Sequence, residues 1–91
     1  LRIARMDEAA GMSVIPHSPK VGAESADVLH FGAVAPNLGP FQEVQARAIA
    51  PDSWVTPAFE IRDGLVAVPL GPGFGVEYDP EALRRADHLF I

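Results

Sequence analysis

Apolar and polar residues follow one another with a spacing that changes along the chain, and the changes mark the predicted elements. Residues 1–12 mix apolar and charged side chains and predict the end of an amphipathic helix, which Gly11 terminates. Because this helix is already under way at Leu1, we expect the chain to be a piece of a longer polypeptide. Residues 12–16 form a short apolar run, which is typical of a strand buried on both faces.

A helix and a second strand are predicted next. In residues 22–35 apolar side chains recur every three or four positions, which indicates a helix with one buried face. Pro36 ends this helix, because proline disfavours the helical conformation in the residue before it. Residues 41–45 alternate between apolar and polar side chains, as strands do. Strand, helix and strand in this order predict a βαβ unit with parallel strands.

The second half of the chain has a different character. Residues 50–57 are irregular and rich in proline. Residues 59–61 and 65–68 flank Asp63-Gly64, and this pair is a strong signal for the tight turn of an antiparallel hairpin.

A loop and a short helix are expected to follow the hairpin. Residues 69–75 are rich in glycine and proline, and a helix is predicted from Pro80 to about His88 with Asp79 as its N-cap. The change from a parallel to an antiparallel arrangement divides the chain into residues 1–49 and residues 50–91.

Composition narrows the classes of function. The 91 residues are 48% apolar and 21% charged, which fits at most one packed domain. A net charge of −5 disfavours binding to nucleic acid or to an anionic membrane. The lack of cysteine excludes disulfides, a thiolate nucleophile and cysteine-ligated metals, and we expect a cytoplasmic protein. No run approaches the roughly 20 apolar residues that span a bilayer.

His17 is the first candidate for chemistry, because it directly follows the predicted strand at 12–16. Side chains at the carboxyl ends of parallel strands face the active-site crevice of α/β folds. An imidazole there can act as a general base near neutral pH. The alternative is a loop histidine bonded to backbone.

Glu43 is the second candidate, since it lies in an apolar strand, where a carboxylate is costly unless it is paired or functional. Burial would let it donate a proton to a developing oxyanion. The alternatives are a side chain in solvent or an ion pair with Arg47. His17 and Glu43 occupy matching places on successive strands, so we expect both at a common mouth.

Other motifs give weaker signals. The segment 71–75 lacks the spacing of a dinucleotide-binding loop and predicts a turn. The three histidines, His17, His30 and His88, lack metal-ligand spacing, so no metal ligand and no cofactor-binding residue is assigned in this chain. Ser18 has no histidine partner in a recognisable nucleophile elbow.

Read together, these segments resemble the carboxyl-terminal end of the enolase superfamily, in its mandelate racemase-like branch. The segments that carry the resemblance are, in order, Gly11-Met12-Ser13-Val14-Ile15-Pro16-His17, Leu29-His30, Pro36-Asn37, Phe41-Gln42-Glu43, Asp63-Gly64, Val68-Pro69 and Gly71-Pro72-Gly73-Phe74-Gly75-Val76. The match covers nearly the whole chain.

The resemblance implies an α/β fold: the C-terminal part of a modified TIM-type (β/α)7β barrel, with a tail that returns to an α+β capping domain. Residues 1–49 correspond to the last βα units of the barrel, and residues 50–91 to the tail. It also implies a Mg²⁺ ion, whose ligands lie upstream of this chain, as does the aspartate that orients the histidine.

The implied chemistry is removal of the α-proton of a hydroxy-acid carboxylate through an enediolate. In this scheme His17 is the general base or acid, and Glu43 hydrogen-bonds the substrate carboxylate or the enediolate. A histidine at this position disfavours the cycloisomerase branch, whose bases are lysines. Among the family members that use this histidine, a sugar-acid dehydratase is expected ahead of a racemase or epimerase. That expectation is taken from the family and not from these residues, since in a dehydratase one imidazole can return its proton to the leaving hydroxyl.

The implied partners are a small hydroxy acid, the remainder of the barrel with its capping domain, and further copies of the protein in a homo-oligomer. The isolated chain is expected to be inactive, because a TIM barrel needs about 250 residues. A second hypothesis is a non-catalytic, small acidic α/β interaction module, which would fold as an independent monomer.

Overall fold

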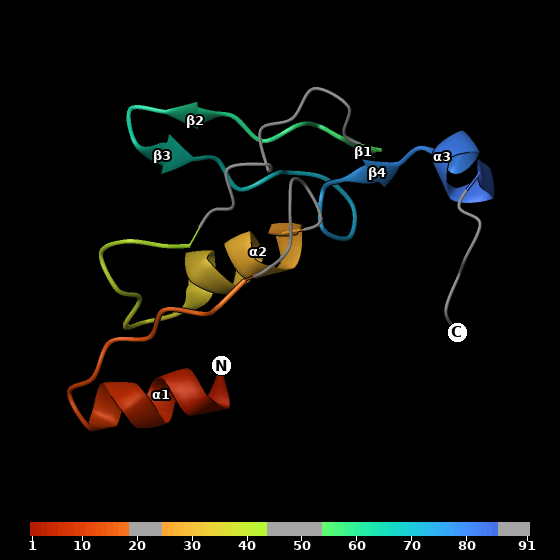
Figure 1. Ribbon diagram of the computed structural model, residues 1–91. Coiled ribbons are helices and arrows are strands. Elements are labelled where there is room, and N and C mark those ends of the chain that lie inside the picture. The colour runs from red at the N-terminus through yellow and green to blue at the C-terminus, as the bar shows by residue number, and fades with distance from the viewer. Residues whose placement is uncertain (19–24, 44–53, 86–91) are drawn as a thin grey trace.

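The computed structural model describes residues 1–18, 25–43 and 54–85 (Figure 1). Predictions that fall on residues 19–24, 44–53 and 86–91, among them those for Arg47 and His88, lie outside the described residues. In chain order the described elements are α1 (Arg2–Ala9), α2 (Ala26–Val34), β1 (Val55–Thr56), β2 (Ile61–Arg62), β3 (Leu65–Val66), β4 (Glu77–Tyr78) and α3 (Pro80–Arg85).

Helix α1 ends where the sequence predicts. Gly11 has a φ of 71°, and its N–H donates to the Glu8 carbonyl at 2.9 Å. The N–H of Met12 donates to the Asp7 carbonyl at 2.8 Å. These two bonds make a Schellman cap, which satisfies carbonyls that have no partner within the helix. Glycine suits this position because it adopts a positive φ without steric cost.

Helix α2 and its flanking segments form a parallel unit, but the pairing is a single bridge. The predicted buried strand at 12–16 is reduced to the bridge residue Val14, and Met12 and Ile15 are 55% and 54% exposed. The helix stops before Pro36, and Ala35 is already extended, with φ −71° and ψ 125°. Val14 and Leu38 then form a parallel bridge, in which Val14 N–H donates to the Asn37 carbonyl at 3.0 Å. The N–H of Gly39 completes the bridge by donating to the Val14 carbonyl at 2.9 Å.

The predicted strand at 41–45 is wrong in its described part, residues 41–43, because the pairing occurs earlier, at Leu38. The next donor in a parallel ladder would be the N–H of residue 16, and Pro16 has none. The carbonyl of Gly39, which that donor would have reached, accepts a hydrogen bond from the Gln42 side-chain amide at 2.8 Å. Pro16 therefore confines the pairing to one bridge.

The predicted hairpin is confirmed. Strands β2 and β3 pair antiparallel, with Ile61 opposite Val66. The two residues of the turn, Asp63 and Gly64, have φ values of 53° and 76°. Positive φ at both central residues is the turn geometry that matches the twist of the flanking strands.

A second antiparallel pair, β1 with β4, was not predicted. Val55 lies opposite Tyr78, and the Trp54 and Tyr78 rings have their centres 5.2 Å apart. Helix α3 follows β4, and Asp79 caps it as predicted, because its Oδ1 accepts the Glu81 N–H at 2.8 Å.

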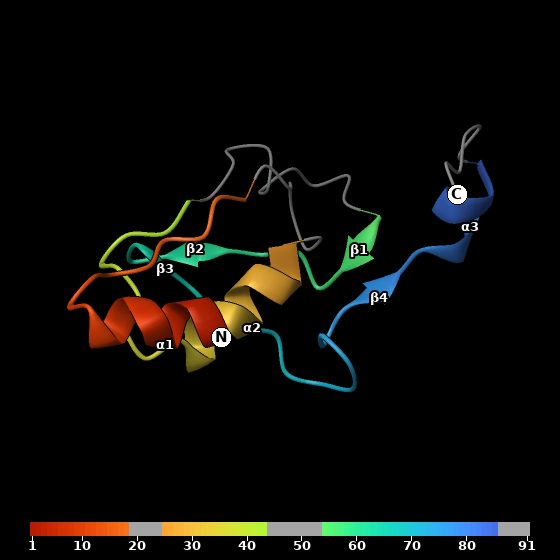
Figure 2. The same cartoon turned by 90° about the horizontal axis from the view of Figure 1, so that it is seen from below.

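Helix α2 lies between α1 and the two strand pairs, and α3 lies at the end of the molecule away from α1 (Figures 1 and 2). The buried cluster of Ala26, Val55 and Phe59 joins α2 to the strand region. Leu29 and Val76 pack against this cluster. The core is small and apolar, and it holds the parallel unit against the antiparallel tail.

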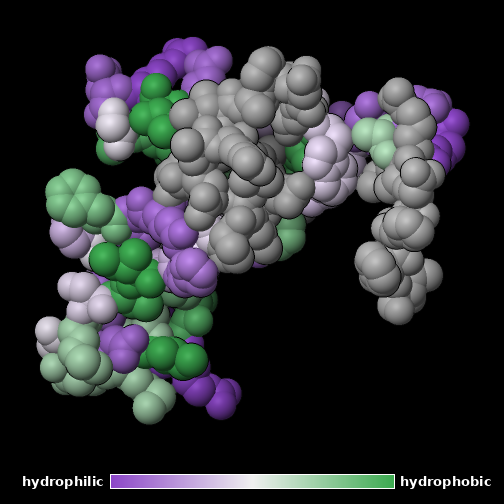
Figure 3. Space-filling view, viewed as in Figure 1, coloured by the Kyte–Doolittle hydropathy of each residue, from purple (hydrophilic) through white to green (hydrophobic). Residues whose placement is uncertain are grey.

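Many large apolar side chains of the described residues remain at the surface. Leu70 is 92% exposed and Phe41 is 82% exposed. Figure 3 shows apolar side chains at the surface on the half of the molecule that holds α1 and α2. The chain exposes 7126 Å², whereas a compact monomer of 9.7 kDa exposes about 5,100 Å². These surfaces are typical of a segment that packs against further protein.

The described helices are also too short or too polar for a membrane: none of them has both the length and the apolar character that crossing a bilayer requires.

Candidate active site

His17 and Glu43 are in direct contact. The Nδ1 atom of His17 lies 2.7 Å from Oε2 of Glu43. The parallel bridge at Val14 and Leu38 brings together the two segments that carry them. The two side chains lie close together, as expected, although 25 residues of chain separate them. They do not lie on two successive strands, because residues 41–43 form no strand.

A backbone donor fixes the carboxylate of Glu43. The N–H of Ser18 donates to the same Oε2 atom at 2.9 Å. Ser18 is only 4% exposed, whereas the side chains of Glu43 and His17 are 31% and 79% exposed. The carboxylate is thus partly screened from water on the Ser18 side, while the imidazole faces outward.

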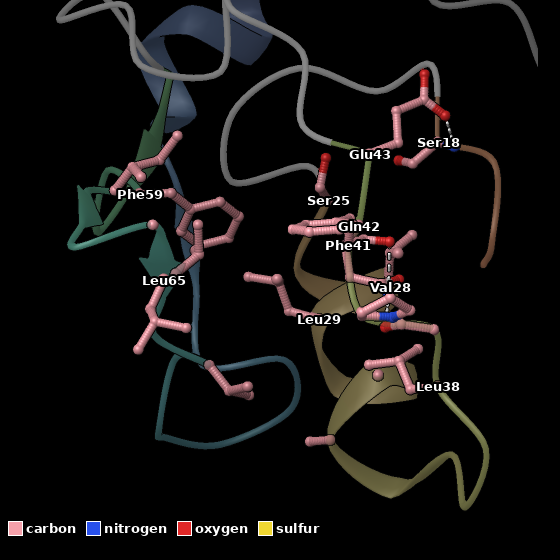
Figure 4. A pocket seen from close by; sticks show the side chains of 18 residues that line it. Ser18, Ser25, Val28, Leu29, Leu38, Phe41, Gln42, Glu43, Phe59 and Leu65 are labelled. Carbon is pink, nitrogen blue, oxygen red and sulfur yellow. Dashed lines mark hydrogen bonds between the residues drawn. The ribbon is translucent and has the colours of Figure 1, made fainter. Parts of the chain in front are cut away.

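Glu43 also lies at one end of a pocket of about 410 Å³. Figure 4 shows Leu29 on α2 facing Phe59 and Leu65 across this pocket, and Ser18 near Glu43 at one end. His17 does not line the pocket, so the two side chains share a contact and not this cavity. The pocket is mainly apolar, and among its described lining residues only Glu43 carries an ionisable side chain.

Other side chains singled out in the sequence have structural roles. His30 Nε2 lies 3.0 Å from the carbonyl oxygen of Phe74, which ties α2 to the glycine- and proline-rich segment. This segment forms the predicted turn, closed by a hydrogen bond of 3.0 Å from Gly75 N–H to the Pro72 carbonyl. The buried hydroxyl of Ser18 has no hydrogen-bond partner, so it does not form a Ser-His pair with His17.

Two groups that shape the site were not predicted from the sequence. The backbone N–H of Ser18 donates to the Glu43 carboxylate, and the side-chain amide of Gln42 donates to the Gly39 carbonyl. A backbone donor leaves no trace in residue type, so the first could not be identified. The Gln42 contact could have been predicted from Pro16. Because proline has no N–H, the carbonyl that residue 16 would have bonded in a parallel ladder needs another donor.

The described residues do not form a metal site. Within residues 1–18, 25–43 and 54–85, no three histidine or acidic side chains lie together in a way that could hold an ion. These described residues by themselves therefore do not supply a complete set of Mg²⁺ ligands.

Comparison with known proteins places the chain in a family. The family described as enolase C-terminal domain-like matches residues 1–82. A chloromuconate cycloisomerase of Pseudomonas putida is 32% identical over 89 residues, which are 93% of this chain and 23% of that protein. The preference against cycloisomerases drawn from His17 receives no support from this relative.

Solved structures from the same superfamily are similar to this chain. Two crystal structures of an enolase of the mandelate racemase subgroup from Agrobacterium tumefaciens, both with a succinimide residue, superpose with TM-scores of 0.69 and 0.70 at 29% and 30% identity. The second also contains sodium and phosphate. They cover 91% of this chain and 22% and 23% of their own chains.

The chain thus spans about a quarter of the length of these relatives. The match to the C-terminal domain of this family and the superposition on these structures are consistent with the C-terminal portion of the barrel. The chain belongs to the enolase C-terminal domain-like family, in the mandelate racemase-like branch of the enolase superfamily.

Proposed function

We propose that this chain belongs to an enzyme that removes the α-proton of a small hydroxy-acid carboxylate, with a sugar-acid dehydratase as the specific activity. The imidazole of His17 takes the proton from the α-carbon, and the imidazolium returns it to the departing β-hydroxyl, which leaves as water. Glu43 is the second group of the site and, in its protonated form, donates a hydrogen bond to the substrate carboxylate or the enediolate in the substrate complex. Mg²⁺ is the proposed cofactor, held by residues outside this chain.

The observation that carries this proposal is the contact of 2.7 Å between His17 and Glu43. An imidazole held by a carboxylate is a common arrangement for a general base, because the carboxylate stabilises the imidazolium that forms on proton transfer. The other nitrogen of His17 is on an exposed ring, where a substrate can reach it. Family membership supports an enzyme of this superfamily, and the position of this pair supports proton abstraction.

The proposal also needs partners. We propose that the remainder of a barrel and its capping domain cover the exposed apolar surfaces, and that the complete protein forms a homo-oligomer. The exposed side chains of Leu70 and Phe41 favour this over a self-contained interaction module.

Substitution of His17 with asparagine in the full-length protein tests the assignment. Loss of the general base should lower kcat by about 10²- to 10⁴-fold, with Mg²⁺ affinity by calorimetry close to that of the wild type. H30N is the matched control: the His30 ring contacts Phe74 and lies outside the site, so this variant should retain turnover. Wild-type turnover in H17N would refute the role of His17.

A cycloisomerase is the second candidate, favoured by the 32% identity to the enzyme from Pseudomonas putida. The two activities differ in product, so the full-length protein should be assayed with acid sugars, following the 2-keto product of dehydration, and with a chloromuconate, following lactone formation. Turnover of acid sugars is the expected result. Turnover of the chloromuconate alone would replace the dehydratase assignment with the cycloisomerase.

A further inference from the structure

The segment between the parallel bridge and Glu43 has few anchors among the described residues. The bridge ends at Gly39, whose N–H donates to the Val14 carbonyl at 2.9 Å, and Pro16 cannot donate the next ladder bond. Phe41 is 82% exposed, so its ring adds little packing within this chain. Fixing the backbone of each residue costs conformational entropy, so the segment needs other contacts to hold it.

The side chain of Gln42 makes two such contacts. Its Nε2 atom donates to the Gly39 carbonyl at 2.8 Å and to the Phe41 carbonyl at 3.0 Å. An amide nitrogen carries two hydrogens, so it can serve both carbonyls. The first bond links residues three apart and closes residues 39–42 into a ring. Gln42 therefore takes the place of the backbone donor that Pro16 lacks.

Glu43 directly follows this ring. Its Oε2 atom accepts the Ser18 N–H at 2.9 Å and lies 2.7 Å from Nδ1 of His17. Both partners lie on the other segment of the parallel unit, so the carboxylate meets them only if the backbone at residue 43 is held at the right distance. A displacement of about 1 Å in a site can cost about 100-fold in rate.

We infer that Gln42 is a positioning residue for Glu43, because its side-chain amide replaces the ladder bond that Pro16 cannot make. Holding residues 39–42 in this way keeps the Glu43 carboxylate opposite the Ser18 N–H. The effect on turnover rests on the proposed function, in which Glu43 hydrogen-bonds the substrate or the enediolate. The contact with the Ser18 N–H can be measured without substrate, so the positioning of Glu43 can be tested independently of that function.

Amide hydrogen exchange in the full-length protein tests the position of Glu43. The protein is labelled with ¹⁵N-serine and ¹⁵N-glycine, and the Ser18 and Gly75 signals are assigned by substituting each residue. In Q42A the exchange rate of the Ser18 amide should rise by about tenfold or more, as it should in E43A, because its acceptor is displaced or removed. The Gly75 amide, which donates to the Pro72 carbonyl, should be unchanged and reports that the fold is intact.

Two further variants separate hydrogen bonding from packing. Q42E keeps the size of the side chain, but an ionised carboxylate can only accept, so this variant should behave as Q42A does. P16A restores an N–H at the position that faces the Gly39 carbonyl in a parallel ladder. In the P16A background, Q42A should therefore raise the Ser18 exchange rate less than it does in the wild-type background.

Turnover gives the second readout. Q42A should lower kcat by about 10- to 100-fold with a smaller change in KM, and P16A should reduce this loss. A Ser18 amide as protected in Q42A or E43A as in the wild type, or a loss that P16A does not reduce, would overturn the inference even if Q42A is inactive. Faster Ser18 exchange in Q42A with wild-type turnover would support the positioning of Glu43 and refute its proposed role with the substrate.

Discussion

Replacing Gly39 with alanine tests how closely the two segments of the site must approach. Gly39 is buried beside the parallel bridge, where its N–H donates to the Val14 carbonyl. A Cβ atom built on Gly39 would lie 2.5 Å from Cγ1 and 2.8 Å from Cδ1 of Ile15. Carbon atoms in favourable contact lie about 3.5–4.0 Å apart, so in G39A either the Ile15 side chain or the backbone must move.

The loss of stability in G39A depends on whether the clashing atom of Ile15 can move away. Cγ1 is bonded to Cβ of Ile15, so rotation about χ2 moves Cδ1 and leaves Cγ1 in place. Relief therefore requires a change in χ1, which is stiff in β-branched residues, or separation of the two backbones. An off-rotamer side chain costs about 0.5–1.5 kcal/mol and overpacking about 1–3 kcal/mol. We expect G39A to lower the free energy of unfolding by about 1–3 kcal/mol.

Urea unfolding of the full-length protein measures this loss. G32A is the matched control, because a Cβ on Gly32 would meet Leu38 Cδ2 at 3.4 Å, and alanine is favoured over glycine in a helix by up to about 1 kcal/mol. G32A should keep or raise the unfolding midpoint, and I15A in the G39A background should recover part of the loss. A wild-type midpoint for G39A, or no recovery with I15A, would refute the reasoning.

The remaining predictions concern the tail. D79A removes the acceptor of the Glu81 N–H and should cost about 1 kcal/mol, whereas D79N should retain most of the stability; equal melting temperatures for D79A and the wild type would contradict the cap. G75A should destabilise more than G64A, because its Cβ would lie 2.8 Å from backbone atoms of Pro69, whereas nothing lies within 4 Å of a Cβ on Gly64. Both glycines have positive φ, so G64A measures the conformational cost alone, which is about 1 kcal/mol. Equal losses of unfolding free energy in G75A and G64A would show that the contact with Pro69 relaxes without cost.

Element ends were predictable where one or two residues decide the backbone. Three kinds of signal act within a few residues: a positive φ, the restriction that proline places on the residue before it, and a side-chain cap. They are found at Gly11, Pro36, Asp63-Gly64 and Asp79. The signals are local, so they can be identified in the sequence alone. The family motifs then placed these elements in order.

Pairing between distant segments was less predictable. The β1–β4 pair joins two strands of two residues each, which are too short to show an alternating pattern. The candidate site was more predictable than the distant pairing but less predictable than the element ends. The proximity of His17 and Glu43 was expected from the order of the two segments that carry them, although residues 41–43 form no strand. The Ser18 N–H that holds the carboxylate belongs to the backbone, which every non-proline residue shares.

The order of pairing in the tail has a consequence for how it folds. Residues 55–56 and 77–78 are far apart along the chain, while the β2–β3 hairpin between them closes through a turn of two residues. Hairpins form in about 1–10 μs, and the entropy lost in closing a loop grows with the number of flexible residues. If the hairpin forms first, residues 61–66 are already ordered, so fewer flexible residues remain in the loop between β1 and β4. The entropy lost when β1 pairs with β4 is then smaller. We therefore expect the rate of β1–β4 pairing to depend on Asp63 and Gly64, which belong to neither strand.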